Sequence, residues 1–317
     1  MRSIQRRFLL ALSLSAALAN RAVGQTSRIR LGTAQEGGGF VIYGAAFIDA
    51  IRLVDPTLEI ADVPTNGSVE NVPRLESGDL DIALVSGEVT RELFGSADRP
   101  ATKLRVITAM YLVPGMFVVR ADSRYHSIDD LRGQAVVWNG YKSGFAVQAH
   151  YFMDGLGLDI EKDFTPVYIK RLSDGPRLVI DGGAAALWGG GQRWPGFVEV
   201  ANSGRGARFI VPNADEIQRI RKRHPFLAPV TVPAALYPGQ YEPLETLGTW
   251  SFVLARADLD DTIGFRLARA LAKAERLSQL SRQLGETTAK NTLNAVASVE
   301  MLQPGVSRYY KTIGLLP

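Results

Sequence analysis

The segment that most constrains the fold runs from residue 64 to residue 87, where a polar turn, a helix pattern and an apolar run follow one another directly. After the turn Asn66-Gly67-Ser68, apolar residues recur at helical spacing as far as Leu75. The run LDIALV at 80–85 then predicts a buried strand. Polar loops at a helix N-terminus and at a strand C-terminus are common ligand positions in open α/β sheets. The segment therefore predicts an α/β fold with binding loops and no catalytic chemistry.

Strand and helix patterns alternate along the rest of the chain in two runs. The first predicts strands at 28–34, 58–63, 80–85, 103–111 and 116–120 with helices between the earlier ones, which favours a parallel sheet covered by helices. A second run of similar layout extends from 134 to 211, and an apolar strand at 247–255 can return to the first unit. We therefore expect two α/β lobes, one formed by 25–122 plus 240–317 and the other by 123–239. The chain is expected to cross between them near 120–127 and 233–250, which would make a hinge.

The first 24 residues have the composition of a secretory signal peptide. Arg2, Arg6 and Arg7 precede an apolar run at 8–19, and small residues follow around Ala19 and Gly24. We expect cleavage near residue 19 or 24 and a periplasmic location. Cleavage after Ala19 removes three arginines and no acid, so the formal net charge falls from +4 to +1. The mature chain then has no electrostatic footprint for nucleic acid.

The residues that usually carry catalysis or bind metals are sparse. There is no cysteine, and the three histidines share no metal-ligand spacing. Acidic pairs such as Asp129-Asp130 precede helix patterns, where they favour the helix dipole. The glycine-rich loop at 32–39 matches a dinucleotide fingerprint only weakly and lets backbone amides approach a ligand equally well. We therefore expect no cofactor, no metal and no enzymatic activity.

Polar and aromatic loops recur at matched positions in the two lobes, at 35–43, 66–71 and 86 in the first and at 141–145 and 188–194 in the second. Backbone amides at the helix starts near Ser68 and Ser143 could hold a carboxylate. Lys142 could add charge, and aromatic residues that include Tyr111 and Trp194 could form walls.

Five stretches carry a family resemblance: GTAQEGGGFVIYG at 32–44, TNGSVENVPRLESGDLDIALV at 65–85, DDLRGQAVVWNGYKSG at 129–144, AALWGGG at 185–191 and GVSRYYKTIG at 305–314. With them, the chain resembles the TAXI-type solute-binding proteins of tripartite ATP-independent periplasmic (TRAP) transporters. The resemblance implies a two-lobed periplasmic-binding-protein fold, type II-like. It also implies capture of a small organic acid or amino-acid-like solute and its delivery to a TRAP membrane permease. Asn66 stands where glycine is usual in the family.

The resemblance places family binding positions at Gly38, Tyr43, Asn66, Gly67, Ser68, Asn71 and Ser143. Together with the loops, the candidate ligand-binding residues are Gln35, Gly38, Phe40, Tyr43, Asn66, Gly67, Ser68, Asn71, Ser86, Tyr111, Tyr141, Lys142, Ser143, Phe145, Trp188, Gly190 and Gln192. Two other classes stay open at this point. One is a ligand-sensing protein that docks on a membrane receptor, and the other is a periplasmic enzyme of unrecognised type.

Overall fold

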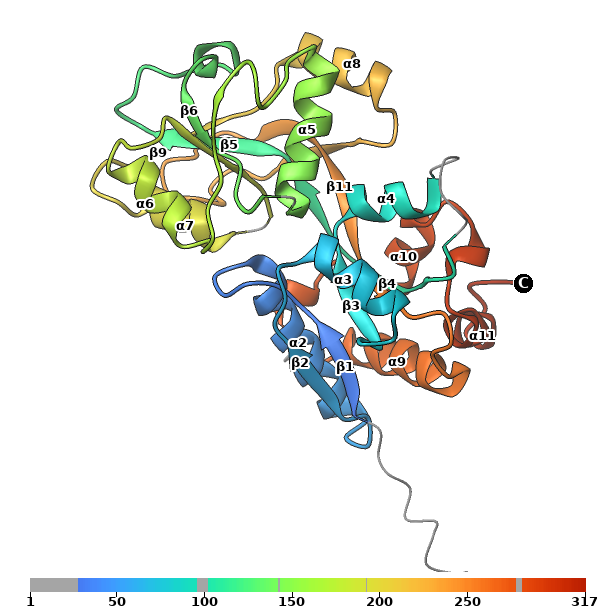
Figure 1. The fold of residues 1–317 in the computed structure, drawn as a ribbon. Helices are drawn as coiled ribbons and strands as arrows, with labels where there is room; N and C mark the ends of the chain where they lie inside the picture. Colours follow the sequence, from blue (N-terminus) through green and yellow to red (C-terminus); the bar gives the residue numbers. More distant parts are fainter. Residues whose placement is uncertain (1–27, 96–101, 142, 192, 278–280) are drawn as a thin grey trace, which may run out of the picture.

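Two β-sheets, each with its own helices, form the two lobes of the protein (Figure 1). The structure is a computed structural model that describes residues 28–95, 102–141, 143–191, 193–277 and 281–317. The expected signal peptide lies outside the described residues, as do Lys142 and Gln192. No helix within the described ranges has both the length and the apolar character that a membrane crossing requires.

The first sheet is mixed, whereas the sequence favoured a parallel one. Its strands, in spatial order, are β10 (Ala228–Val232), β11 (Leu244–Ala255), β3 (Ile82–Val85), β1 (Ile29–Gly32) and β2 (Ile60–Val63), with β4 (Arg105–Pro114) also paired to β11. Strands β1, β2 and β3 run parallel, as the intervening helices require. β11 is antiparallel to β3, β4 and β10 because the chain returns from the second lobe in the opposite direction.

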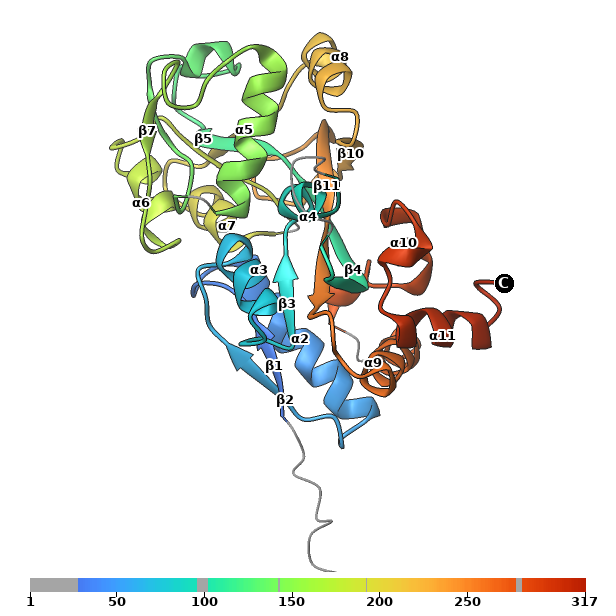
Figure 2. The same cartoon turned by 45° about the vertical axis from the view of Figure 1, so that its right-hand side comes forward.

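Helices from both ends of the chain pack on this sheet. They are α2 (Gly39–Val54), α3 (Ser68–Glu76), α4 (Gly87–Gly95), α9 (Asp261–Ala274), α10 (Ala289–Ala295) and α11 (Pro304–Thr312), with the short turns η2 (Arg282–Leu284) and η3 (Val299–Met301). α9 packs against both α2 and α11, so the C-terminal segment completes the lobe that the N-terminal segment begins (Figure 2). Apolar residues of the strands and of these helices form one core.

The second sheet has the order β7 (Thr165–Val167), β6 (Ala135–Val137), β8 (Ala186–Gly189), β5 (Met116–Arg120), β9 (Ala207–Ile210). Its helices are α5 (Gly144–Leu156), α6 (Asp174–Ile180), α7 (Pro195–Ala201) and α8 (Ala214–Arg223), and η1 (Asp129–Leu131) precedes β6. β5 is buried on both faces, because Phe117 and Val119 enter one core while Met116 and Val118 enter another.

The chain crosses between the sheets at Gly115 and again along β11. Gly115 joins β4 of the first sheet to β5 of the second; its amide donates to Leu247 O (2.9 Å), and its carbonyl accepts from Thr246 Oγ1 (2.7 Å). The first crossing therefore comes before the expected range 120–127, and the strand at 116–120 belongs to the second sheet rather than to the first lobe. The second crossing falls within the expected range 233–250. β10 lies in the expected second-lobe range but pairs with β11 in the first sheet.

The segment from residue 64 to residue 87 folds as predicted, and the structure extends it. α3 begins at Ser68 and β3 ends at Val85. A further helix, α4, then starts at Gly87, where the sequence predicts only a loop after the strand. Val89 and Leu93, one helical turn apart, are both buried and fix α4 in the core.

Candidate functional site

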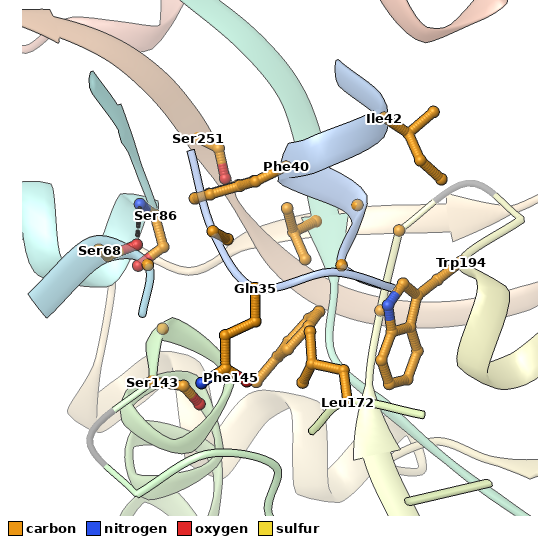
Figure 3. A pocket seen from close by; sticks show the side chains of 18 of the residues that line it. Gln35, Phe40, Ile42, Ser68, Ser86, Ser143, Phe145, Leu172, Trp194 and Ser251 are labelled. Atoms are coloured by element: carbon orange, nitrogen blue, oxygen red, sulfur yellow. Dashed lines mark hydrogen bonds between the residues drawn. The ribbon is translucent and has the colours of Figure 1, made fainter. Parts of the chain in front are cut away.

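One cavity of about 590 Å³ opens between the two lobes and is lined by residues of both (Figure 3). From the first lobe come the loop after β1, the starts of α2, α3 and α4, and part of β11. From the second lobe come the start of α5 and the loops around Ile169 and Trp194. The volume falls within the roughly 300–1,000 Å³ that is typical of small-molecule sites. Its position at strand C-termini and helix N-termini is the one expected for an open α/β fold.

The polar turn before α3 is held by its own side chains. Asn66 Oδ1 accepts from Gln35 Nε2 (2.8 Å), and Asn66 Nδ2 donates to Glu70 Oε2 (2.6 Å). Gly67 follows with φ 93°, a left-handed conformation that disfavours any side chain. Asn66 therefore lines the cavity while its amide secures the turn and the neighbouring loop.

Two helix N-termini, one from each lobe, meet beside Ser86. The amide of Ser86 donates to Ser68 Oγ (2.9 Å), which leaves the Ser68 hydroxyl hydrogen available for another acceptor. A Cβ atom built on Gly144 would lie 2.7 Å from Ser86 Oγ and 3.3 Å from Ser68 Oγ, so the start of α5 approaches the first lobe closely. The first amides of a helix have no partner within the helix and favour an anion. The meeting point of α3 and α5 is thus suited to a carboxylate.

Ser143 is the N-cap of α5 and also lines the cavity. Its Oγ accepts from the Ala146 amide at 3.3 Å, and the backbone conformation of Ser143 is extended, as an N-cap requires. The cap fixes the direction of the first turn of α5, including Phe145. Ser143 therefore positions the amides that face the first lobe.

Besides the tyrosines Tyr111 and Tyr141, three apolar aromatic rings line the cavity. Phe40 comes from α2, and Phe145 and Trp194 from the second lobe (Figure 3). The rings of Phe145 and Trp194 lie 5.0 Å apart between centroids. A Cβ on Gly196 would come within 2.7 Å of the Trp194 ring, so the absence of a side chain there makes room for the indole. These rings provide an apolar surface at fixed orientation.

At its inner end the cavity has a polar floor, formed by Ser86, Glu88, Gln148 and Ser251. All four are buried, and Glu88 is only 2% exposed. Glu88 Oε1 accepts from Thr249 Oγ1 (2.6 Å) on the crossing strand β11, and Gln148 Nε2 donates to Val113 O (3.1 Å) at the end of β4. Burial raises the pKa of the Glu88 carboxyl, an effect that the hydrogen bond from Thr249 only partly offsets.

Exposed cations lie at the cavity mouth. Lys170 and Arg193 come from the second lobe and Arg282 from η2 of the first, and all three are exposed residues that line the cavity. Exposed charges of one sign attract an oppositely charged solute over a distance but contribute little to a close pair in water.

Most of the candidate residues surround this one cavity. Those that line it are Gln35, Gly38, Phe40, Asn66, Gly67, Ser68, Ser86, Tyr111, Tyr141, Ser143, Phe145 and Gly190. The structure brings them together from both lobes, and contact with a ligand stays a proposal for each of them.

Three candidates do not line the cavity, and the sequence prediction for them is corrected. Tyr43 is buried in the first core and bonds to Thr287 (2.9 Å between the hydroxyls). Asn71 is buried beneath the loops, where its Nδ2 donates to Thr33 O (2.9 Å) and Leu84 O (2.8 Å). Trp188 is buried in the second lobe, with its ring 4.7 Å from that of Phe117. All three support the loops of the site from behind.

Sequence reasoning found Ser86 but missed the other three residues of the floor and the cations at the mouth. Glu88 follows Ser86 so closely that it could have been suspected, but a glutamate in the first turn of a helix is ordinary there. Gln148 lies in the middle of a helix pattern and Ser251 in the middle of a strand, so their burial between the lobes carries no local signal. Lys170, Arg193 and Arg282 come from loops and turns that only the tertiary fold brings together.

None of the three histidines lines the cavity, and the described part of the chain holds no cluster of three or more histidine, aspartate or glutamate side chains arranged for a metal ion. The described residues can hold a solute by backbone amides, side-chain hydroxyls and apolar contacts.

Comparison with known proteins agrees with this architecture. PhnD1 from Prochlorococcus marinus (MIT 9301), solved in complex with methylphosphonate, is 13% identical with a TM-score of 0.54 over 92% of this chain and 100% of that one. A full-length mutant of BenM is also 13% identical, with a TM-score of 0.51 over 85% of this chain and 74% of that one. At such identity the likeness concerns the fold, and it confirms the expected two-lobed periplasmic-binding-protein fold.

A family model provides the more specific relationship. The model described as the NMT1-like family matches residues 31–314, which extend from β1 to the residues just after α11. The match includes both sheets, both crossings and every described residue that lines the cavity. The chain therefore belongs to the NMT1-like family.

Proposed function

We propose that this protein is a periplasmic solute receptor that captures a small organic acid or amino-acid-like solute between its lobes and delivers it to a TRAP-type membrane permease. The observation that carries the proposal is the cavity between the lobes, at which the N-termini of α3 and α5 meet beside Ser86. A ligand at that point contacts both lobes at once. Only the closed arrangement makes both sets of contacts, so the ligand shifts the population toward closure.

The amide-rich meeting point supports an anionic head group. The residues that begin α3 and α5 line the cavity, where their first amides and the Ser68 hydroxyl are hydrogen-bond donors. The Glu70 carboxylate in the first turn of α3 is paired with Arg74. The exposed cations at the mouth would raise the rate at which an anion arrives. PhnD1, which shares the fold, was solved with a small anion, methylphosphonate.

Delivery to a TRAP permease rests on the sequence resemblance, and the proposed periplasmic location rests on the N-terminal segment. Uptake measurements in proteoliposomes that contain the permease subunits would test the delivery step. We expect uptake under an imposed ion gradient to require the receptor. Uptake that proceeds equally without it would contradict this part of the proposal.

The binding step is tested by a thermal-shift screen of the mature protein against organic acids, amino acids and their neutral amide counterparts. A ligand at one hundred times its Kd adds about 2.7 kcal/mol to the free energy of unfolding. We expect at least one carboxylate to raise the melting temperature by several degrees, while its amide counterpart does not. A shift with neutral solutes alone would contradict the role of the helix N-termini.

A further inference from the structure

The two ends of the cavity differ in chemistry, and this difference restricts the class of ligand. The floor is buried and polar, the walls are apolar and aromatic, and the mouth carries exposed cations. A ligand that fills the cavity must therefore place a polar group at the floor and an apolar part between the walls. The inference below rests on the proposed solute-binding function and concerns the ligand of that same cavity.

The floor contains polar atoms that need a partner. Ser251 Oγ and Gln148 Oε1 are buried and have no hydrogen-bond partner among the described residues. Ser251 is 0% exposed and Gln148 1% exposed, so bulk water does not satisfy them. A buried polar group without a partner costs about 1–3 kcal/mol. A polar head group that reaches the floor would remove part of that cost.

The acid in the floor faces no cation. Among the described residues Glu88 forms no ion pair, and the side chains that hydrogen-bond to it, those of Thr249, Gln148 and Ser86, are all neutral. On the adjoining helix α5, Tyr151 is the titratable group that interacts electrostatically with Glu88. Tyr151 interacts in the same way with Arg91 and Glu92 of α4. Burial of Glu88 without a countercharge favours the neutral carboxylic acid, which donates a hydrogen bond where a carboxylate can only accept.

The floor then presents hydrogen-bond donors from several sources. The hydroxyls of Ser68, Ser86 and Ser251, the Glu88 carboxyl when it is neutral, and the first amides of α3 and α5 all belong to residues that line the cavity. A carboxylate has about four acceptor positions and no donor. A carboxylate therefore matches the hydrogen-bond donors at this end of the cavity. An ammonium group, which can only donate, would face these same donors and could not pair with them.

Beyond the floor, the cavity walls are largely apolar, and the polar side chains that also line the cavity include the acid Glu286 as well as Gln35, Asn66 and Tyr111. Phe40, Phe145 and Trp194 flank the space, and Ile42 and Leu172 extend the apolar surface outward (Figure 3). A second carboxylate placed here would lose its hydration, with cations available only at the exposed mouth. A ring or branched hydrocarbon body would instead bury apolar area against flat aromatic faces.

We propose that the ligand is a monocarboxylic acid with an apolar, ring-sized body, whose carboxylate meets the floor at Ser68, Ser86 and Glu88 and whose body lies between Phe40, Phe145 and Trp194. Dicarboxylates and polar amino acids bind less well because their second polar group falls against the aromatic walls.

Isothermal titration calorimetry at pH 7 with phenylacetate, glutarate, L-glutamate and phenethylamine tests this ligand class. We expect phenylacetate to bind at least tenfold more tightly than glutarate or L-glutamate, and phenethylamine to bind more weakly than phenylacetate. If glutarate or L-glutamate binds and phenylacetate does not, the inference is wrong while the proposed function stands. If no acid binds, both fail.

The Glu88→Gln variant tests the floor separately. Glutamine is a neutral isostere that still donates a hydrogen bond, so we expect the Kd for phenylacetate to stay within about threefold of that of the unchanged protein. Glu92→Gln, on the exposed face of the same helix, is the matched control. Tight phenethylamine binding by the unchanged protein that falls more than thirtyfold in Glu88→Gln would show that Glu88 is an ionised counter-ion and would overturn the inference.

The same variant has a readout in stability against pH. Because the pKa of Glu88 is raised in the folded state, the folded protein keeps a proton that the unfolded chain releases. The contribution of Glu88 to stability is fully present below the pKa that Glu88 has in the unfolded chain. It is lost as pH rises through the higher pKa that Glu88 has in the folded protein. We therefore expect the melting temperature of Glu88→Gln to rise relative to the unchanged protein between pH 5 and pH 8. An identical pH dependence in both would contradict a neutral Glu88.

Discussion

Replacing Gly144 with valine is expected to weaken ligand binding at least 100-fold while leaving the free protein folded. A Cβ at this position would lie 2.7 Å from Ser86 Oγ, 2.9 Å from Ser86 Cβ and 3.3 Å from Ser68 Oγ, all in the opposite lobe. The branched side chain would hold the lobes apart where the ligand must contact both. A 100-fold change in Kd corresponds to about 2.7 kcal/mol.

This prediction is measured by calorimetry with the carboxylate that gives the largest thermal shift. Gly204→Val is the matched control, because a Cβ at Gly204 has no heavy atom within 4 Å and the residue is exposed. The melting temperature of ligand-free Gly144→Val should stay close to that of the control. Unchanged affinity in Gly144→Val would mean that the ligand does not require the approach of α5 to α3.

The largest effect on stability is expected from Gly190→Ala, at the crossing between the lobes. A Cβ at Gly190 would lie 1.7 Å from Pro114 O and 2.9 Å from Pro114 C, which are backbone atoms at the end of β4. Neither atom can turn away, since Gly115 next to them is bonded to Leu247 and Thr246. Strain from overpacking costs about 1–3 kcal/mol and sometimes more, and here we expect at least about 3 kcal/mol.

Urea unfolding followed by tryptophan fluorescence measures this change. Gly204→Ala is the control, and its midpoint should match that of the unchanged protein to within the error of the fit. A loss of less than about 1 kcal/mol in Gly190→Ala would show that the crossing strands shift easily. In that case the close packing of Gly190 on Pro114 would not contribute to the stability of the crossing.

Local patterns in the sequence were sufficient for most of the fold. The helices at α2, α3, α5 and α6, and the strands between them, follow from apolar spacing and from the turn residues that bound them. α4 was missed because Ser86-Gly87 is a strong turn signal, although Val89 and Leu93 carry the helical spacing. The mixed first sheet was missed because strand direction depends on where the chain returns from the second lobe, which no local pattern encodes.

The candidate site was predictable where it consists of loops next to regular elements. Gly67, Ser68, Ser86 and Ser143 follow this rule, since the ends of strands and the starts of helices converge at one edge of an open α/β lobe. Tyr43 was wrongly chosen because a tyrosine in the second turn of a helix can face a core or a cavity with the same sequence spacing. Its hydroxyl reaches Thr287, which is 244 positions away in sequence.

The polar floor shows the limit of reading the chain segment by segment. Glu88 and Thr249 are separated by 161 positions and meet only because β11 returns beside β3. The burial of Glu88 against Thr249 therefore depends on the second crossing and not on the residues next to Glu88 in the sequence.

The central claim, that a solute is captured by closure of the two lobes, is tested most directly by the distance between them with and without ligand. The chain has no cysteine, so spin labels at Ala45→Cys on α2 and Glu199→Cys on α7, both exposed positions, would be specific. We expect electron–electron double resonance to show a broad distance distribution in the free protein and a narrower, shorter one at saturating phenylacetate. An unchanged distribution, under conditions where calorimetry shows the site to be saturated, would contradict the claim.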